Sequence, residues 1–323
     1  MKNIEDSLKA YGKRIDEHLK ELFPCKYDYL SEPIWYHMDS GGKRMRPALC
    51  LIVCEALGGN PDEAVPFAAA VEVLHNMFLM HDDIEDGDTM RRDKPTVWVK
   101  YGTANAINVG DYMLGRAYRS ILDRSLSLEK RLRLLDIFTL TYEKTVEGQA
   151  LDINWRGSTK FTIENYLQIV ELKTAYYLTC GMVGGAVVAG TSDRVIEKIW
   201  ELGKSMGPAF QIRDDLIDLT QGKGRGGVIG SDIREGKPSF LYAYTLGVAG
   251  AADRERLIEI MLKPRENTSS REVNEVIALY KKYDAINYSQ NYAEGLVERA
   301  FKTIEEIPVD DKATFREIAQ FMA

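Results

Sequence analysis

Apolar side chains recur at helical spacing through most of the chain. In residues 166–180 and 255–262, for example, they return every three or four positions, which is the spacing of one helix face. Alternation of period two, which would indicate strands, is scarce. Residues 4–23 form a charged amphipathic segment without the features of a signal peptide. The pattern predicts an all-α protein.

The most hydrophobic run, AYYLTCGMVGGAVVAG, covers residues 175–190. It is shorter than the stretch of about 20 residues that spans a bilayer as a helix. We therefore expect a buried central helix, whose glycines allow neighbouring helices to approach closely. No proline- or serine-rich linker, low-complexity tract or fixed repeat divides the chain. One domain covering residues 1–323 is the expectation.

Composition narrows the function classes. The formal net charge is −7 and no broad basic stripe is present, so a nucleic-acid partner is not expected. The four cysteines (Cys25, Cys50, Cys54 and Cys180) show neither zinc nor disulfide spacing, which favours a reduced, cytoplasmic location. His18 and His37 are expected to be surface or partly buried residues, and His81 is expected to pack between helices.

Two acidic motifs of the form Asp-Asp-x-x-Asp are the main chemical signal. The first is DDIED, Asp82–Asp86, and the second is DDLID, Asp214–Asp218. Residues four positions apart share one helix face, so each motif presents paired carboxylates that repel unless a cation lies between them. Two such sets facing each other form an all-oxygen site for Mg²⁺, which is usually completed by substrate phosphates. The motifs predict a metal-bridged diphosphate site in a helical bundle.

Two basic clusters accompany the acidic motifs. Arg91 and Arg92 follow the expected end of the first metal-binding helix at Gly87, and arginine forms bidentate bonds with phosphate. The other cluster is GGKRMRP, residues 41–47, in which glycines precede the basic side chains and Pro47 suits the first turn of the next helix. Together the clusters indicate two anionic groups, one bound through metal and one bound directly.

The ordered motifs resemble those of the trans-isoprenyl diphosphate synthases. The family pattern is matched by GGKRMRP, by DDIED followed by RRDKPT, by GQALD from Gly148, by Lys173-Thr174, and by FQIRDDLID from Phe210. The resemblance covers essentially the whole chain. It implies the isoprenoid-synthase helical bundle around a central cavity, Mg²⁺ as cofactor with three ions in each active site, and a homodimer.

The resemblance also implies roles for individual residues. Those that match the isopentenyl diphosphate site are Lys43, Arg46, His75 and Arg92. Those that match ligands of Mg²⁺ on the allylic diphosphate are Asp82, Asp86, Asp214 and Asp218, with Asp83 as a weaker match. Those that match the side chains neutralising that diphosphate are Arg91, Lys173 and Lys237. Thr174 and Gln211 match polar groups beside the allylic carbon, where positive charge develops.

Helix geometry suggests a limit on product length. Phe78 lies four residues before Asp82, one turn or about 5 Å further down the helix, and Met77 is beside it. Bulky side chains at these positions should close the lower end of a product tunnel, although ordinary core packing also explains Phe78. We expect a short-chain product, with geranylgeranyl diphosphate favoured and farnesyl diphosphate next.

Two departures and two other activities stay open. The lysine that the family usually places before the Gly-x-Asp-Ile stretch is missing, and either Lys223 or Arg225 would have to replace it. RRDKPT stands in place of the commoner RRG-x-PT. A class I terpene cyclase would ionise the same kind of substrate, but DDLID and GGKRMRP favour elongation. A non-catalytic subunit of a two-component synthase would tend to lack aspartates that are all present here.

Overall fold

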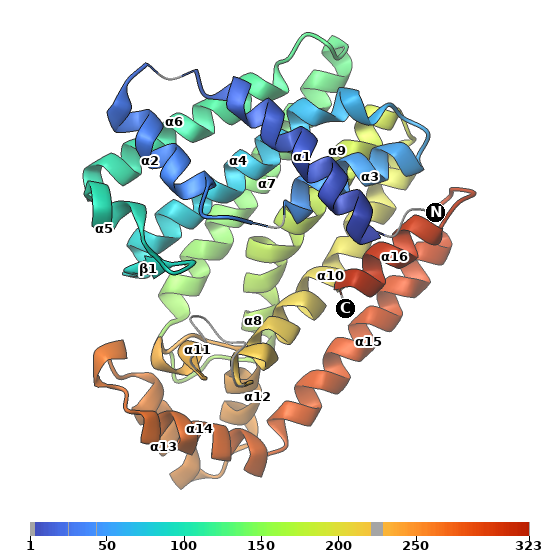
Figure 1. The fold of residues 1–323 in the computed structure, drawn as a ribbon. Coiled ribbons are helices and arrows are strands. Elements are labelled where there is room, and N and C mark those ends of the chain that lie inside the picture. Colours follow the sequence, from blue (N-terminus) through green and yellow to red (C-terminus); the bar gives the residue numbers. More distant parts are fainter. Residues whose placement is uncertain (1–3, 25, 43, 221–228, 323) are drawn as a thin grey trace. The chain divides into compact units, whose positions relative to one another are not determined.

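The computed structural model describes residues 4–24, 26–42, 44–220 and 229–322. These residues are almost entirely helical, as the sequence pattern predicts, and the element order can be followed in Figure 1. Contacts group the chain into two compact units. The first comprises residues 1–142, 178–200 and 307–318, and the second comprises 143–177, 201–306 and 319–323.

The N-terminal half supplies most of the first unit. Its helices are α1 (Ile4–Leu22), α2 (Asp28–Met38), α3 (Met45–Ala56), α4 (Pro61–Glu85), α5 (Val97–Tyr101) and α6 (Thr103–Ile121). The strands found in the described residues are β1 (Met90–Arg91) and β2 (Lys94–Pro95), which form one antiparallel hairpin. Helix α4 packs against both α3 and α6, and α1 packs on α3 and α4. The expected amphipathic N-terminal helix is therefore confirmed.

The remaining helices follow in chain order. They are α7 (Leu128–Trp155), α8 (Ile163–Val170), the π-helical turn η1 (Glu171–Ala175), α9 (Tyr176–Ala189), α10 (Asp193–Asp218), α11 (Ser231–Arg234), α12 (Phe240–Val248), α13 (Ala251–Met261), the 3₁₀ turn η3 (Arg265–Asn267), α14 (Ser270–Lys282), α15 (Ala285–Glu306) and α16 (Ala313–Met322). In the second unit α12 packs against α8, α14 and α15.

Glycines determine how closely α9 packs in the first unit. A Cβ added at Gly184 would lie 2.0 Å from the Phe67 ring, and one at Gly185 would lie 2.2 Å from the Cys50 carbonyl oxygen. Real Cβ atoms do not approach so closely, so any larger residue would push α9 away from α3 and α4. The buried central helix predicted from the hydrophobic run is confirmed.

Helix α4 is the one described helix that is long and apolar enough to cross a membrane. Within its most hydrophobic window, however, 72% of the residues are buried inside the structure. Such burial is typical of a core helix. Helix α4 begins at Pro61 after the N-cap Asn60, whose side chain accepts the Asp62 backbone N–H.

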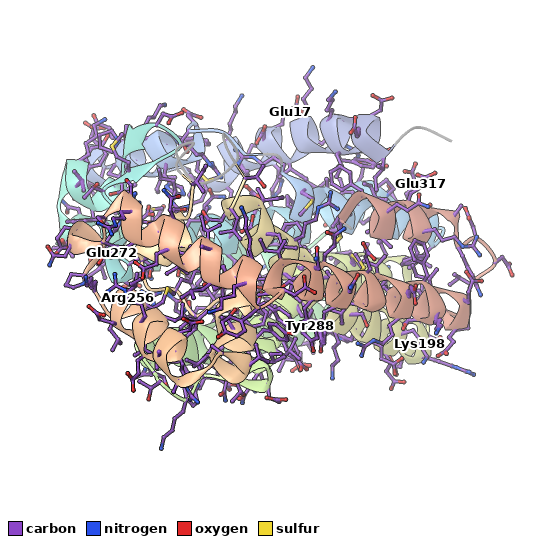
Figure 2. The ribbon with its side chains drawn as sticks, turned by 90° about the horizontal axis from the view of Figure 1, so that it is seen from below. Glu17, Lys198, Arg256, Glu272, Tyr288 and Glu317 are labelled. Atoms are coloured by element: carbon purple, nitrogen blue, oxygen red, sulfur yellow. The ribbon has the colours of Figure 1, made fainter. Side chains whose placement is uncertain are left out.

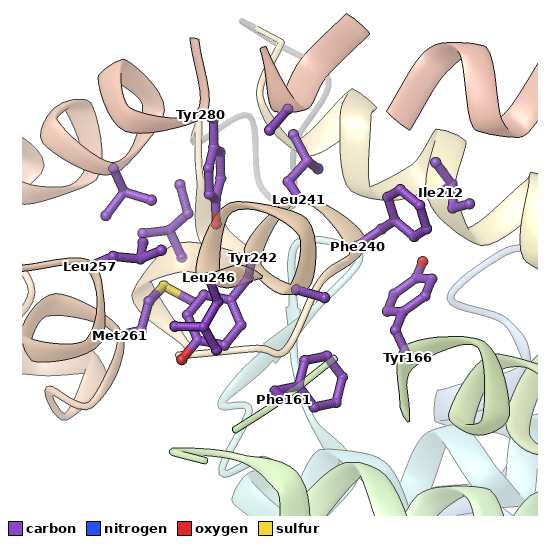
Figure 3. Close-up of a cluster of buried hydrophobic side chains, with 14 of the residues drawn as sticks. Phe161, Tyr166, Ile212, Phe240, Leu241, Tyr242, Leu246, Leu257, Met261 and Tyr280 are labelled. Carbon is purple, nitrogen blue, oxygen red and sulfur yellow. The ribbon is translucent and has the colours of Figure 1, made fainter. Parts of the chain in front are cut away.

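An aromatic cluster forms the core of the second unit. Figure 3 shows Tyr166 and Phe240 close together in this cluster, and their rings meet edge to face at a centroid distance of 5.4 Å. On the surface of the same unit, Arg256 of α13 donates to Glu275 of α14 at 2.8 Å and lies 3.7 Å from Glu272 (Figure 2). The cluster and the ion pairs hold α12, α13 and α14 together.

Candidate active site

The first acidic motif lies at the C-terminal end of α4. The helix ends at Glu85, Asp86 is its C-cap, and Gly87 follows with φ of +66°, the left-handed conformation that glycine adopts at a helix end. Asp82 and Asp86 are partly exposed, and the Asp86 backbone N–H donates to the Asp82 carbonyl oxygen at 2.8 Å. The predicted helix and its stop at Gly87 are confirmed. The two carboxylates are one turn apart on one helix face.

Asp83 differs from its two partners. It is 1% exposed, and its Oδ1 accepts hydrogen bonds from Nε and Nη2 of Arg91, both at 2.7 Å. Burial raises the pKa of Asp83 to about 6, although Arg91 acts to lower it. In the structure, Asp83 therefore holds the first of the two adjacent arginines.

Arg92 and Asp93 form the two-residue turn of the β1–β2 hairpin. Arg91 pairs with Lys94 across the hairpin, and both turn residues have positive φ, +52° for Arg92 and +62° for Asp93. This backbone is that of a type I′ turn, in which aspartate is tolerated and glycine is favoured. The departure from RRG-x-PT therefore falls at a left-handed turn position. From this turn Arg92 donates to the Ser40 hydroxyl at 3.2 Å and to the Gly41 carbonyl.

Several basic side chains lie near His75 on α4. The pKa of His75 is held well below its ordinary value, first by burial and then by the positive charges of Arg46, Arg92 and Arg91. Three arginines therefore lie near enough to act on this one histidine. Arg46, His75 and Arg92, which the sequence assigned to one diphosphate, therefore lie close together in the first unit. Lys43, assigned to the same group, lies outside the described residues.

The second acidic motif lies at the C-terminal end of α10, in the second unit. Asp214 is exposed, whereas Asp218 is 6% exposed. The Oδ1 atom of Asp218 accepts the Ser231 backbone N–H at 3.2 Å and the Ser231 hydroxyl, and its Oδ2 accepts the Asp232 backbone N–H at 3.1 Å. Burial raises the pKa of Asp218, and nearby Asp232 adds to the effect. Asp218 thus fixes the start of α11.

Asp215, the second residue of this motif, is almost fully buried. Its carboxylate accepts the Tyr166 hydroxyl at 2.9 Å, the Phe240 backbone N–H at 3.1 Å and the Gln211 amide at 3.3 Å, and Lys237 Nζ is 3.9 Å away. Burial raises the pKa of Asp215 to about 7, and Lys237 opposes that rise. Asp215 therefore connects α8, α10 and α12 with the segment that carries Lys237.

Lys173 and Thr174 lie in the π-helical turn η1, a distortion often found at functional sites. Lys173 Nζ donates to Asp152 on α7 at 2.9 Å, and Thr174 Oγ1 lies 3.4 Å from Gln211 Oε1 on α10. A Cβ at Gly148 would be 2.5 Å from the Lys173 backbone nitrogen, so only glycine allows α7 to approach η1. The GQALD motif therefore positions Lys173 through two contacts: Gly148 packs against its backbone, and Asp152 accepts a hydrogen bond from its side chain.

The two proposed chain-length residues have different surroundings. Met77 is 1% exposed, whereas Phe78 is partly exposed and stacks on Tyr142 of α7, with centroids 5.8 Å apart and rings inclined by 17°. Below them on α4, Leu74 is fully buried. Tyr142 was not singled out by the sequence, because no local pattern indicates which ring of α7 meets α4.

The structure therefore groups the predicted residues within each unit. Asp82, Asp83, Asp86, Arg91, Arg92, Arg46 and His75 belong to the first unit, and Lys173, Thr174, Gln211, Asp214, Asp218 and Lys237 belong to the second. Lys223 and Arg225, the two substitutes considered for the absent lysine, lie outside the described residues. His37, expected to be no more than partly buried, is 4% exposed. His81 packs on α6 as expected, because a Cβ at Gly110 would be 2.2 Å from its Nε2.

The aspartates supply a donor set suited to Mg²⁺. Within the part of the chain that the structure describes, no three His, Cys, Asp or Glu side chains are gathered closely enough to hold a metal by themselves. The partly exposed pair Asp82 and Asp86 offers only carboxylate oxygens, which Mg²⁺ prefers. An ion held by one or two carboxylates and completed by substrate phosphate fits this arrangement.

Comparisons with known proteins agree with the motifs. The sequence model of the polyprenyl synthetase family matches residues 27–280. A short chain isoprenyl diphosphate synthase of Methanothermobacter thermautotrophicus is 33% identical, covering 96% of this chain and 95% of the relative. A geranylfarnesyl diphosphate synthase of Aeropyrum pernix is 31% identical, covering 92% and 93% of the two chains.

The fold agrees as well. The crystal structure of geranylgeranyl pyrophosphate synthetase from Pyrococcus horikoshii Ot3 superposes with a TM-score of 0.90 at 32% identity, covering 98% of this chain and 97% of that one. The resemblance inferred from the motifs and the all-α fold class are thereby confirmed. With its acidic helix ends and its basic side chains near His75, this chain is a member of the polyprenyl synthetase family.

Proposed function

We propose that the protein is a Mg²⁺-dependent short-chain trans-prenyltransferase. It condenses isopentenyl diphosphate head to tail with an allylic diphosphate, which is dimethylallyl, geranyl or farnesyl diphosphate. The observation that carries this proposal is that α4 carries two different groups: His75, with arginines nearby, and the carboxylates of Asp82 and of Asp86 at its C-cap. One group suits a bare diphosphate and the other a metal-bound one.

The isopentenyl substrate is held without metal in this proposal. Arg46 and Arg92 bind its diphosphate by charge-assisted hydrogen bonds, with Lys43 as a further ligand. His75 stays neutral beside them, since burial and the arginines depress its pKa. A neutral imidazole can donate one hydrogen bond to a phosphate oxygen without adding charge. The double bond of this substrate is the nucleophile.

The allylic diphosphate is held through metal. Asp82, Asp86, Asp214 and Asp218 would hold the Mg²⁺ ions, three in each active site, with Asp83 contributing by positioning Arg91. Bound Mg²⁺ stabilises the negative charge that develops on the departing diphosphate. Arg91, Lys173 and Lys237 neutralise the same diphosphate. The carbonyl and hydroxyl oxygens of Gln211 and Thr174 face the allylic carbon and stabilise its developing positive charge.

The remaining steps require a dry channel. Water would capture the allylic cation as an alcohol, so the apolar wall below the aspartates must exclude it. After the new carbon–carbon bond forms, a proton leaves the former isopentenyl unit, and the released diphosphate is the base that accepts it. The chain then lengthens along the wall that contains Phe78.

Product length is the finer part of the proposal. The bulk of Phe78, backed by Tyr142, favours a product of twenty carbons, geranylgeranyl diphosphate, with farnesyl diphosphate next. Similar proteins include a geranylgeranyl diphosphate synthase, whose named product has the proposed length, and a geranylfarnesyl diphosphate synthase, whose named product is longer. We further propose that the two units of each chain act as one catalytic domain and that the enzyme is a cytoplasmic homodimer. A mass from sedimentation equilibrium of twice the chain mass of 36.5 kDa would support the dimer.

A single incubation tests the function. Purified protein, Mg²⁺, farnesyl diphosphate and labelled isopentenyl diphosphate should yield a longer labelled diphosphate, identified by chromatography after phosphatase treatment. A hydrocarbon product would indicate a terpene cyclase instead. Absence of product unless a second protein is added would indicate a subunit of a two-component synthase. Repeating the assay with excess chelator should abolish the product.

A further inference from the structure

Arg44 has an unusual place in the first unit. It is the N-cap of α3, and its backbone is left-handed with φ of +47°. We call the described residues Ser40–Gly42 and Arg44–Arg46 the anion loop. Such a conformation costs a non-glycine residue free energy and persists only where the surroundings hold it. The side chain supplies that hold, because it turns away from solvent and bonds to other helices.

The guanidinium of Arg44 connects three elements. Its Nε donates to Asp16 of α1 at 2.8 Å, its Nη1 donates to Glu72 of α4 at 2.7 Å, and its Nη2 donates to the Met38 carbonyl at the end of α2 at 3.2 Å. This use of the whole planar fork is available to arginine and not to lysine. The anion loop is thereby tied to α1, α2 and α4 by one side chain.

Glu72 is the buried end of this network. It is 3% exposed, and its carboxylate also accepts the Asn76 amide at 2.9 Å. Burial raises the pKa of Glu72, while Arg44 and Asn76 lower it. A buried ion pair adds little net stability compared with apolar packing, because removing two charges from water is costly. The Arg44–Glu72 ion pair therefore has a role other than stability, and the contacts of Arg44 indicate that the role is to fix the backbone around it.

The other side of the anion loop is also fixed. A Cβ added at Gly181 of α9 would be 2.6 Å from the Arg46 carbonyl oxygen, so α9 packs closely on the backbone at Arg46, in the first turn of α3. Arg92 donates to Ser40 and Gly41 at the opposite end of the loop. The Arg92 side chain thus bonds to Ser40 and Gly41, α9 packs on Arg46, and Arg44 bonds to three other helices.

We propose that Arg44 and Glu72 are positioning residues for isopentenyl diphosphate, which set the anion loop so that Arg46 faces His75 and Arg92. Asp16 supports the network from its exposed side, and Asn76 supports it from the buried side. This inference rests on the proposed function of Arg46, His75 and Arg92. It assigns the two residues no contact with substrate.

The test is a comparison of Michaelis constants for the two substrates. Glu72→Gln keeps the side chain's shape but removes the charge that holds Arg44. We expect KM for isopentenyl diphosphate to rise at least about tenfold, with KM for farnesyl diphosphate within about twofold of wild type and kcat little changed. Arg44→Lys, which keeps the charge but loses the fork, should give the same one-sided rise.

Controls separate this proposal from a general loss of structure. Asp193→Asn removes a carboxylate that pairs with Arg133 on the surface of the same unit and should change neither KM. If Glu72→Gln does not fold, Asp16→Asn, which removes a half-exposed partner of Arg44, should still raise the isopentenyl KM by about threefold. Equal rises in both KM values, or an isopentenyl KM within twofold of wild type in these variants, would overturn the proposal.

The same experiment distinguishes this inference from the proposed function. Arg46→Gln should raise the isopentenyl KM whether or not Arg44 and Glu72 position the loop. A rise for Arg46→Gln without one for Glu72→Gln leaves the proposed diphosphate-binding role of Arg46 standing and removes the positioning role. A wild-type protein that elongates no allylic diphosphate removes the proposed function itself.

Discussion

Single aspartates of the two acidic motifs differ in how far they are buried. Asp83 and Asp215 are the second residues of the two acidic motifs, and both are buried and hydrogen-bonded to protein groups. Asp82 is partly exposed and Asp214 is exposed. Each motif therefore contains both buried aspartates and aspartates that are at least partly exposed, and in the second motif the buried ones include Asp218.

Asp82→Ala should lower kcat by roughly a hundredfold to a thousandfold, because one charged ligand of the metal and leaving group is lost. Far-UV circular dichroism should be unchanged, since the side chain is partly exposed at a helix end. Glu85→Ala, in the same turn but exposed, is the matched control and should retain near-normal turnover. Comparable activity in the two variants would contradict the metal role.

His37 should make stability depend on pH. Burial, with Arg91 and Arg92 nearby, lowers its pKa to about 3, while in the unfolded chain it is about 6.5. The unfolded state then binds the proton first, so the free energy of unfolding is complete above about pH 6.5 and falls as the pH drops below it. At pH 5 this loss amounts to about 2 kcal/mol.

His37→Gln removes that titration, whereas His75 titrates in both proteins. Urea unfolding at pH 7.5 and pH 5 should therefore show a smaller loss of stability in the variant, by about 2 kcal/mol. Identical losses in the two proteins would mean that His37 is protonated or exposed in the folded state.

At the scale of elements, helix α4, the turn η1 and the β1–β2 hairpin decide where the candidate residues lie. Helix α4 carries His75, Phe78 and the first acidic motif at intervals of about one turn, so one helix aligns the residues proposed to bind diphosphate, to limit product length and to hold metal. The π-helical turn η1 shifts the register between α8 and α9 at Lys173. The hairpin β1–β2 places Arg91 and Arg92 beyond the end of α4.

Phe78→Ala should lengthen the product by at least one isoprene unit, because it removes a ring one turn below Asp82. Chromatography of dephosphorylated products would measure the shift. Phe78→Tyr keeps the ring stacked on Tyr142 and should leave the length unchanged. An unaltered product from the alanine variant would show that the ring packs in the core and does not limit the tunnel.

Substitutions at Asp93 test whether the β1–β2 turn requires a left-handed backbone at this position. At φ of +62° a residue with a Cβ is strained unless its side chain tolerates the left-handed region, as aspartate does and alanine does not. Asp93→Ala should lower the free energy of unfolding by about 1 kcal/mol, and Asp93→Gly should be roughly neutral. Denaturant titration of the three proteins measures the difference; equal stabilities for the alanine and glycine variants would contradict the turn assignment.

At the scale of the whole molecule, the contacts form two units and the acidic motifs are divided between them. The basic side chains near His75 belong to the first unit, and the Lys173, Gln211 and Lys237 groups belong to the second. Each unit has its own source of order: α3, α4, α6 and α9 pack through small residues in the first, and aromatic rings around α12 pack in the second.

The sequence alone determined the helical class, the helix that ends at Gly87, the family and the residue types of the site. These follow from periodicity and from motifs, which are local and need no knowledge of partners. Tertiary structure decided which aspartates are buried, that Tyr142 backs Phe78, and that Arg44 turns inward to Glu72. Those facts depend on contacts between residues far apart in the chain, such as Arg44 with Asp16 or Tyr166 with Asp215. The sequence pattern specifies which residues share a helix face. Packing of one helix on another decides which side chains become partners, because only the packed structure sets the distances between side chains and removes water from around them.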